Sequence, residues 1–537
     1  PTAPANTTWR VLWIWNGPAG PDAGVAGDHL YLPEAMAPVA GEGRLYVGHS
    51  DGAVRAIRAN DGALAWTRQL GGEIVNSGAY DPLTRAVYFG AAVRGEGPAR
   101  GRLYKLRPSD GAVLGQLDLD GPVNQAVLLA GDTVYVGTMA GTLYAVNPAT
   151  MAARWTYAAG APLLASAAYA SKGGGLVIFP SEDGYVHAVR AANGVQAWRV
   201  QVNVSQRPER DRRPQGGDYR PAAYFPDTYA VVAEAADAVI IRSYYDWQLT
   251  WAPNGGAPAS QSEIRAYIEA NPRNESFFVL DLDDGRKRFI APVLGGAIGN
   301  GNYYYSSPPQ AVVKRLPDGS DVAYLFWRNR AACRLSPSSC DGREDTTIGE
   351  MDLQTGAIRF VQDHKNQGTM RVPTDEQGQL AMVGDVLFHS HWMSLGALRI
   401  PDRSVGGESF ANPIPSEEYM SISNTVAART CPGRITAQRY CPVGHTSPTD
   451  PYQLDPGFYI YFGDESVYDN QFKAPVRTVI YDSGVLYWRS NDGAIIALAP
   501  TGVNPPTPAG EPAPAPSVVP SSSPVEGFGV RLPYLQR

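Results

Sequence analysis

Short runs of alternating apolar and polar residues make up most of the chain, and glycine-containing turns separate them. Thr142–Val146 (TLYAV) is one such run, and Asp132–Thr138 (DTVYVGT) is the run before it. Alternation with a period of two, bounded by Gly, Asn and Asp, predicts antiparallel β-strands joined in hairpins. A short helix is expected only at Ser260–Ala270 (SQSEIRAYIEA). The pattern therefore predicts an all-β chain.

One phrase recurs along the chain with fixed offsets: a small residue, a polar residue at +2, a glycine at +6 and an aromatic at +10. It is clearest at Ala56–Trp66 (AIRANDGALAW) and Ala188–Trp198 (AVRAANGVQAW). Met151 replaces the glycine in Ala145–Trp155, and Gly115 replaces the aromatic in the copy KLRPSDGAVLG. The aromatic residues that end the other copies are expected to have a structural role: Trp66, Trp155, Trp198, Phe289 and Phe360.

The phrase describes a strand, a turn with positive φ at the glycine, and an outer strand whose aromatic packs on the preceding strand. Together with the strands upstream, it makes a four-stranded blade. The first copies begin at residues 56, 105, 145 and 188, so the units are 40 to 49 residues long. Blades of this size set around an axis form a β-propeller. We expect eight blades, with seven as the alternative because Leu395–Ser404 lacks a clear phrase.

The last unit (VLYWRSNDGAIIALAP) ends before its aromatic residue. The N-terminal segment Thr8–Trp15 (TWRVLWIW) supplies a strand rich in tryptophan, and we expect it to form the missing outer strand of the last blade. Such a closure ties the two ends of the ring and removes a free edge. The predicted organisation is a propeller over residues 1–500, with insertions near 203–275 and 405–475, followed by a Pro-rich extended tail at 501–537.

The phrase resembles the Ala-x-Asp-x-x-x-Gly-x-x-x-Trp repeat of pyrroloquinoline-quinone (PQQ) enzymes and their non-enzymatic relatives, over most of residues 8–500. The resemblance implies that an active member would carry adjacent cysteines above the cofactor, together with Glu, Asn and Asp around calcium. This chain has no Cys-Cys pair, no matching acidic motif and no CxxCH haem signature. We therefore expect a non-catalytic member without a cofactor, and PQQ with Ca²⁺ is the alternative.

The four cysteines fall in two local pairs, which we expect to form disulfides in an oxidising compartment: Cys333 with Cys340 and Cys431 with Cys441. Three sequons permit glycosylation, at Asn6, Asn203 and Asn274. The chain begins at Pro1, as a removed signal peptide or a trimmed start would leave it. These features predict an exported protein in the periplasm, at the cell surface or outside the cell.

Composition and charge narrow the partners. The net charge of −7 and the pI near 5.6 argue against a nucleic-acid surface, which is normally basic. No apolar run reaches the roughly 18 residues that a transmembrane helix needs. Proteins, including further copies of this chain, and carbohydrates are the partner classes that stay open.

Several local motifs are interpreted as structural. His389 and His391 (HSHW) lie on one face of an expected strand and have no third metal ligand, and Asp281–Arg286 (DLDDGR) coincides with a repeat turn. Loop or strand roles are expected for the remaining segments, although aromatics near loops can also bind sugars or proteins: Gly173–Leu176, Gly295–Asn302, Tyr303, Tyr304, Tyr305 and Gly463–Ser466.

Long ordered loops on a rigid scaffold are common sites of function. The sequence therefore predicts a non-catalytic interaction or self-assembly scaffold, such as a surface-layer or filament subunit, that uses the tail and the two insertions. The alternatives are a PQQ-dependent alcohol or sugar dehydrogenase with a degenerate site and a carbohydrate-binding propeller. An outer-membrane assembly factor with similar repeats ranks lower, because those chains are shorter and lack disulfides and such a tail.

Overall fold

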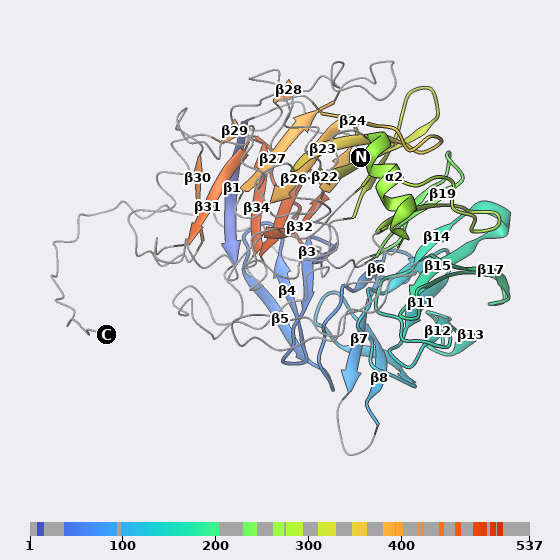
Figure 1. Cartoon of the computed structure of the whole chain (residues 1–537). Helices are drawn as coiled ribbons and strands as arrows, with labels where there is room; N and C mark the ends of the chain where they lie inside the picture. The colour runs from blue at the N-terminus through green and yellow to red at the C-terminus, as the bar shows by residue number, and fades with distance from the viewer. Residues whose placement is uncertain are drawn as a thin grey trace, which may run out of the picture.

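The protein is described by a computed structural model (Figure 1). Its described regular elements are β-strands, apart from one α-helix and one 3-10 turn. The structure describes residues 8–15, 37–93, 98–202, 229–243, 261–272, 275–293, 310–328, 346–361, 380–391, 394–400, 417–418, 421–422, 440–444, 457–462, 476–490, 495–500 and 502–508. The expected all-β fold is confirmed.

The first four sheets are regular four-stranded antiparallel blades in chain order. The first holds β2 (Val39–Gly41), β3 (Arg44–Gly48), β4 (Ala53–Arg58) and β5 (Leu64–Gln69). The second holds β6 (Ala79–Asp81), β7 (Ala86–Val93), β8 (Arg100–Leu106) and β9 (Val113–Leu119). The third holds β10 (Leu128–Ala130), β11 (Thr133–Gly137), β12 (Thr142–Val146) and β13 (Ala153–Ala158). The fourth holds β14 (Ala168–Ala170), β15 (Leu176–Ser181), β16 (Tyr185–Arg190) and β17 (Gln196–Gln201), with the 3-10 turn η1 (Lys172–Gly174) before β15.

The fifth sheet has only three strands in the described residues: β18 (Val231–Ala233), β19 (Ala238–Arg242) and β20 (Phe277–Asp281). After the turn at Gly285, the chain returns to β20 through one bridge, Leu280 to Lys287, and one hydrogen bond from Arg288 N to Val279 O (3.0 Å). These contacts are too few for a fourth strand. The helix α2 (Gln261–Ala270) lies between β19 and β20 in the chain, as expected.

The last three sheets complete the ring. The sixth holds β21 (Val312–Arg315), β22 (Asp321–Arg328), β23 (Thr346–Asp352) and β24 (Ile358–Phe360). The seventh holds β25 (Leu380–Val383), β26 (Val386–His391) and β27 (Ser394–Arg399), extended by β31 (Gly457–Phe462), β30 (Tyr440–Gly444) and β28 (Glu417–Glu418). The last holds β32 (Val476–Asp482), β33 (Val485–Ser490), β34 (Ile495–Pro500), β1 (Thr8–Trp15) and β29 (Ser421–Ile422).

The first strands of successive sheets contact one another in order, from β2 through β6, β10, β14, β18, β21 and β25 to β32. This arrangement is a β-propeller with the first strand of each blade innermost. The sequence predicted eight blades. In the described residues, a blade of four or more strands occurs seven times, and the fifth unit is reduced to three strands. The prediction of eight blades is therefore corrected to seven full blades, the number given as the alternative, because the fifth sheet has only three strands in the described residues.

The N-terminal strand closes the ring at the expected place. β1 pairs antiparallel with β34, and Figure 1 shows the blue strand β1 beside the orange-red strand β34. Trp13 stands opposite Ala497, as Trp66 stands opposite Ala56 in the first blade. The division into a domain at 1–500 and a separate tail stays a prediction, because only residues 502–508 of the tail are described.

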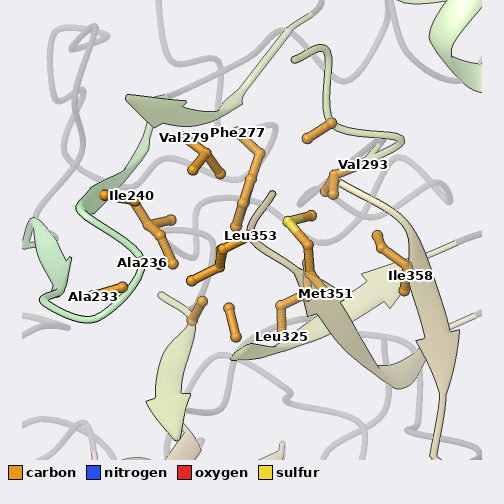
Figure 2. Close-up of a cluster of buried hydrophobic side chains, with 14 residues drawn as sticks. Ala233, Ala236, Ile240, Phe277, Val279, Val293, Leu325, Met351, Leu353 and Ile358 are labelled. Atoms are coloured by element: carbon orange, nitrogen blue, oxygen red, sulfur yellow. The ribbon is translucent and has the colours of Figure 1, made fainter. Parts of the chain in front are cut away.

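The hydrophobic core is divided among the junctions between blades. Figure 2 shows one such cluster, where Ile240 and Phe277 of the fifth sheet face Leu325 and Met351 of the sixth. All four side chains are buried. Because each blade buries its face on its neighbour, a ring of this length needs no single large core.

Candidate functional site

The repeat tryptophans lock each blade to the next. Trp66 Nε1 donates to Pro108 O (2.9 Å) in the second blade, and Trp155 Nε1 donates to Ala191 O (3.0 Å) in the fourth. Trp198 repeats the contact across the next junction, donating to Leu282 O (2.8 Å). These residues are therefore structural parts of the ring, and each one satisfies a carbonyl of the following turn.

The repeat glycines provide the surface on which those rings lie. A Cβ atom on Gly111 would come within 2.7 Å of the Trp66 ring, and one on Gly194 would come within 2.6 Å of the Trp155 ring. Both glycines also have positive φ, at 69° and 72°. Glycine is thus required here both by the turn and by the tryptophan of the preceding blade.

Two junctions between blades have other residues in place of the tryptophan and glycine of the repeat. Phe289 lies on Gly356, and because a phenyl ring has no N–H, Arg288 Nη1 donates instead to Leu353 O (3.3 Å). Between the second and third blades, Met151 lies against Gly115, and Lys105 Nζ donates to Pro148 O (2.7 Å). Phe360 ends β24, and its side chain lies outside the described part.

A serine, a histidine and a tyrosine form a chain of hydrogen bonds between the third and fourth blades. Ser181 Oγ lies 2.9 Å from His187 Nε2, and Tyr157 OH lies 3.0 Å from His187 Nδ1. Ser181 also donates to Asp183, and Tyr157 donates to Gln196 Oε1 (2.8 Å). Burial, and then the charge of Arg199, lower the pKa of His187 to about 4.

This network contains the residue types of a hydrolase site, but a substrate could not reach its serine. Ser181 is 1% exposed, His187 is fully buried, and the imidazole stacks on Phe179 with ring centroids 5.2 Å apart. A nucleophile must reach its substrate, and a buried hydroxyl that already donates to Asp183 does not. We assign the network to the junction between the third and fourth blades.

His49 lies at the junction between the first and last blades. It is fully buried, and its ring meets Trp15 edge to face with centroids 5.8 Å apart. Within the described part of the chain, neither ring nitrogen has a hydrogen-bond partner. Burial, and then the charge of Arg55, lower the pKa of His49 to about 3. The neutral imidazole therefore acts as an apolar filler of the closing seam.

Exposed large apolar side chains recur at one structural position on three different blades. Four of the five in the described residues follow the turn between the third and fourth strands of a blade: Leu64, Val113, Leu114 and Val195. Leu64 lies in the first blade, Val113 and Leu114 in the second, and Val195 in the fourth. Leu64 is 50% exposed and Val195 is 55% exposed. The fifth, Leu83, is in the turn between β6 and β7. We call Leu64, Val113, Leu114 and Val195 the rim residues.

The outer strands differ in whether their free edge is covered. In the last blade, β29 pairs with β1, and in the seventh, β30 pairs with β31, which is the fourth strand of that blade. Along β24, the amide of Gln261 from α2 binds the backbone of Ile358, accepting from its N–H (2.9 Å) and donating to its C=O (2.5 Å). No described residue pairs with the outer side of β5, β9, β13 or β17.

Most of the chemical motifs singled out in the sequence lie outside the described residues: Cys333, Cys340, Cys431, Asn6, Asn203, Asn274, Gly295–Asn302, Tyr303, Tyr304, Tyr305 and Gly463–Ser466. Cys441 lies in β30, and His389 and His391 lie in β26, as expected for a strand, with side chains outside the described part. Both disulfides, the glycosylation and any cofactor stay predictions.

Two of the described motifs have structural partners. Asp281 in the DLDDGR turn is paired with Arg288 (2.7 Å) and Arg286 (3.0 Å), so its carboxylate binds cationic side chains. The GGGL segment forms the end of η1 and the start of β15. Among the described residues, no group of three or more His, Cys, Asp or Glu side chains is placed to hold a metal ion. None of their helices is long and apolar enough to cross a membrane.

The exposure of the rim residues was not predicted from the sequence, because the prediction assigned function to the insertions and the tail. A signal was present, because Leu64, Val113 and Val195 follow the repeat glycine by one or two residues, where a turn exposed to water would normally be polar. The Gly115–Met151 contact was also missed, although both departures from the phrase had been noted.

A known protein family matches part of the chain that contains the repeats. A family model described as "Outer membrane protein assembly factor BamB" matches residues 92–291. The match confirms the resemblance to PQQ-like propeller repeats over this stretch. A search among curated proteins finds no match.

Two solved structures align with most of the chain. The crystal structure of BamB from Moraxella catarrhalis is 13% identical, with a TM-score of 0.44, and the alignment covers 89% of this chain and 98% of that one. The computationally designed Ika8 protein is 11% identical, with a TM-score of 0.43, and covers 88% and 99%.

Proposed function

We propose that this protein is an exported, non-catalytic protein-interaction scaffold whose partner contacts the rim residues. Their shared position, where the outer strand of a blade begins, is the observation that carries the proposal. A soluble protein tolerates scattered exposed apolar residues, but repeated exposure at one structural position indicates a contact surface.

The rim residues can contribute to a protein interface. Fully burying an aliphatic side chain of this size contributes about 1.5–3 kcal/mol, and because these side chains are 44–55% exposed, each would contribute on the order of 1 kcal/mol when covered. Paired charged side chains stand in the turns before two of them: Arg58 with Asp61 (2.7 Å) and Arg107 with Asp110 (2.9 Å). Apolar contacts bordered by polar groups are the usual anatomy of a protein interface.

The family match supports the proposal of a protein-interaction scaffold and suggests where in the cell the protein acts. The matched model describes an assembly factor at the outer membrane, and it covers a stretch that includes Val113, Leu114 and Val195. The sequence analysis ranked such a factor below a surface scaffold, and we now rank it first. We extend the proposal to a location at the periplasmic or outer face of a membrane, which the two expected disulfides also favour.

The non-catalytic part of the proposal rests on the buried polar groups. Ser181, His187 and Tyr157 bind one another, and the Asp281 carboxylate is held by two arginines. No observation in the described residues favours a PQQ dehydrogenase or a carbohydrate-binding site. Oxidation of alcohols with an added dye, PQQ and Ca²⁺ would contradict this part of the proposal.

Self-assembly is the finer form of the proposal, in which the partner is a second copy. The described start of the tail runs from the last blade to the first: Gly484 meets Val503, and Gly43 meets Pro508. A deletion that begins after Pro508 therefore removes the rest of the tail without this contact. If the tail carries assembly, the deletion lowers the oligomeric mass measured by light scattering. An unchanged mass would contradict self-assembly through the tail.

Site-specific photo-crosslinking in the source cells tests the function. A photoreactive amino acid is placed at Leu64, Val113 or Val195, and at Leu83 as the control, which is 83% exposed but lies on another turn. We expect the three rim positions to give the same crosslinked species and Leu83 to give none. Crosslinks equal at all four positions, or absent from the rim, would overturn the proposal.

A further inference from the structure

The junction between the last blade and the first differs from the others at its inner side. At every other junction the first strands of the two blades lie against each other, from β2 with β6 to β25 with β32. β32 and β2 have fewer residues close together than any of these pairs. The outer side of this junction is ordinary, because Trp13 Nε1 donates to Ala59 O (2.9 Å) as the repeat tryptophans do elsewhere. The closing junction is therefore less well joined at its inner side.

The start of the tail crosses this junction. A Cβ atom on Gly484, in the turn between β32 and β33, would lie 3.0 Å from Val503 Cγ1. A Cβ atom on Gly43, in the equivalent turn between β2 and β3, would lie 2.8 Å from Pro508 Cα. Residues 502–508 thus connect the last blade to the first at the turns that follow their innermost strands. We call residues 502–508 the strap.

The strap is packed into the core of this junction. Val503 lies against a cluster of buried side chains that includes Leu45 of the first blade and Val485 of the last. Pro508, at the other end of the strap, is buried. Because burial of aliphatic side chains is favourable, detaching the strap would expose apolar surface to water at an energetic cost. The prolines of the strap (VNPPTP) also restrict the detached chain, so less conformational entropy is lost when it binds.

The same turn is uncovered in three other blades. Gly131 lies between β10 and β11, Gly174 between β14 and β15, and Gly319 between β21 and β22. A Cβ atom on any of these three glycines would meet no described atom within 4 Å. Contact with a further segment is therefore not a general property of this turn. It occurs at the two blades that meet at the closing junction, where the inner strands are less well joined.

We propose that the strap is a latch that holds the closing junction of the propeller together at its inner side. It supplies there the contact that the first strands supply between the other blades, while β1 closes the outer side by pairing with β34. When the strap is detached, β2 and β32 can separate locally while β1 remains paired. This inference concerns the opening of the ring, so it is independent of the rim residues and goes beyond the proposed function.

Hydrogen exchange of the full chain tests the latch, because it measures local opening strand by strand. Gly43→Ala places a methyl group against the strap, and Gly131→Ala is the matched control. Both glycines have positive φ, at 72° and 59°, so both variants carry the same kind of backbone strain. We expect Gly43→Ala to speed exchange roughly tenfold or more in β32, which lies across the junction from the substitution. Gly131→Ala should leave β32 unchanged.

Two shortened chains test the latch without adding backbone strain. A chain that ends at Thr501 lacks the strap, whereas a chain that ends at Pro508 keeps the strap and lacks the rest of the tail. We expect exchange in β2 and β32 to be faster in the first chain than in the second, with no difference in β10 or β14. The second chain should match the full chain at all four strands, which separates the latch from any role of the remaining tail in assembly.

Two results would overturn the proposal. If exchange in β32 is the same in Gly43→Ala, Gly131→Ala and the unaltered chain, the strap does not hold the junction. If loss of the strap speeds exchange equally in every blade, the strap stabilises the whole fold rather than the closing junction. The comparison of Gly43→Ala with Gly131→Ala decides the matter even if the chain that ends at Thr501 does not fold.

Discussion

Gly115 and Met151 contact each other with the large and the small residue reversed relative to the repeat. Gly115 stands where the repeat has an aromatic residue, and Met151 stands where it has glycine. In five other described junctions, a tryptophan or phenylalanine of one blade lies on a glycine of the next. Here the glycine stands in the tryptophan position, and Met151 fills the space from the other side. A Cβ atom on Gly115 would lie 2.7 Å from Met151 Cγ, and Met151 itself is buried. The junction keeps its volume although both partners depart from the phrase.

This relationship predicts strong coupling between the two positions. Met151→Gly should destabilise the fold by about 2 kcal/mol, because it leaves a cavity, although it relieves a positive φ of 55°. Gly115→Trp alone should destabilise by about 1–3 kcal/mol, because the ring meets Met151. The double variant restores the ordinary pair and should be more stable than the sum predicts by about 1 kcal/mol or more. Additive free energies of unfolding in denaturant would show that the positions are independent.

The closing strand provides a second prediction. Trp13 Nε1 donates to Ala59 O (2.9 Å), the contact that Trp66 makes with Pro108 O at the next junction. Trp13→Phe and Trp66→Phe should therefore each destabilise the fold by a similar amount, about 1 kcal/mol, since each leaves one carbonyl without its donor. A loss for Trp66→Phe with none for Trp13→Phe would mean that the N-terminal strand adds little to the closed ring.

The two buried histidines predict that stability falls in mild acid. The pKa of His49 is lowered from 6.5 to about 3, and that of His187 from 6.5 to about 4. The unfolded chain therefore binds protons first, so their contribution to stability is complete above pH 6.5 and is lost as the pH falls toward 4 and then 3. Each histidine should contribute a slope of about 1.4 kcal/mol per pH unit below pH 6.

Variants at His49 separate its share of the slope. The groups that act on His49 are Arg55, Asp51, Arg489 and the backbone of Val47. His49→Leu should reduce the loss of unfolding free energy between pH 6.5 and pH 5, because leucine does not titrate. If urea denaturation shows the same loss for this variant and the original chain, His49 is already charged or exposed in the folded state.

Much of the fold was predictable because the repeat encodes it locally. The +10 tryptophan and the +6 glycine meet across a junction, so Trp66 and Gly111 each carry information about the same contact. The closing strand Thr8–Trp15 was predictable for the same reason, since the last phrase lacked an aromatic residue and the N-terminus had one. The fifth blade was not, because Phe289 continues the phrase although its segment forms no regular outer strand.

The candidate site was harder to foresee. Exposure of Leu64 or Val195 is a property of the assembled rim, and a single sequence does not distinguish an exposed valine from a buried one. The contact of Gln261 with the edge of β24 could not be predicted from the sequence either, because a side-chain amide joins two residues that are 97 positions apart. The repeats predict the propeller, whereas the exposure of these side chains depends on how the blades are assembled.

The central claim is that the rim residues bind a protein, and the mass of the native complex in the source cells tests it most directly. A chain with Leu64→Ser, Val113→Ser and Val195→Ser is compared with Leu83→Ser and with the unaltered chain. We expect the triple variant to keep its fold, because all three side chains are exposed, but to migrate as the free chain, while Leu83→Ser stays in the complex. A triple variant that remains in a complex of unchanged mass would contradict the account.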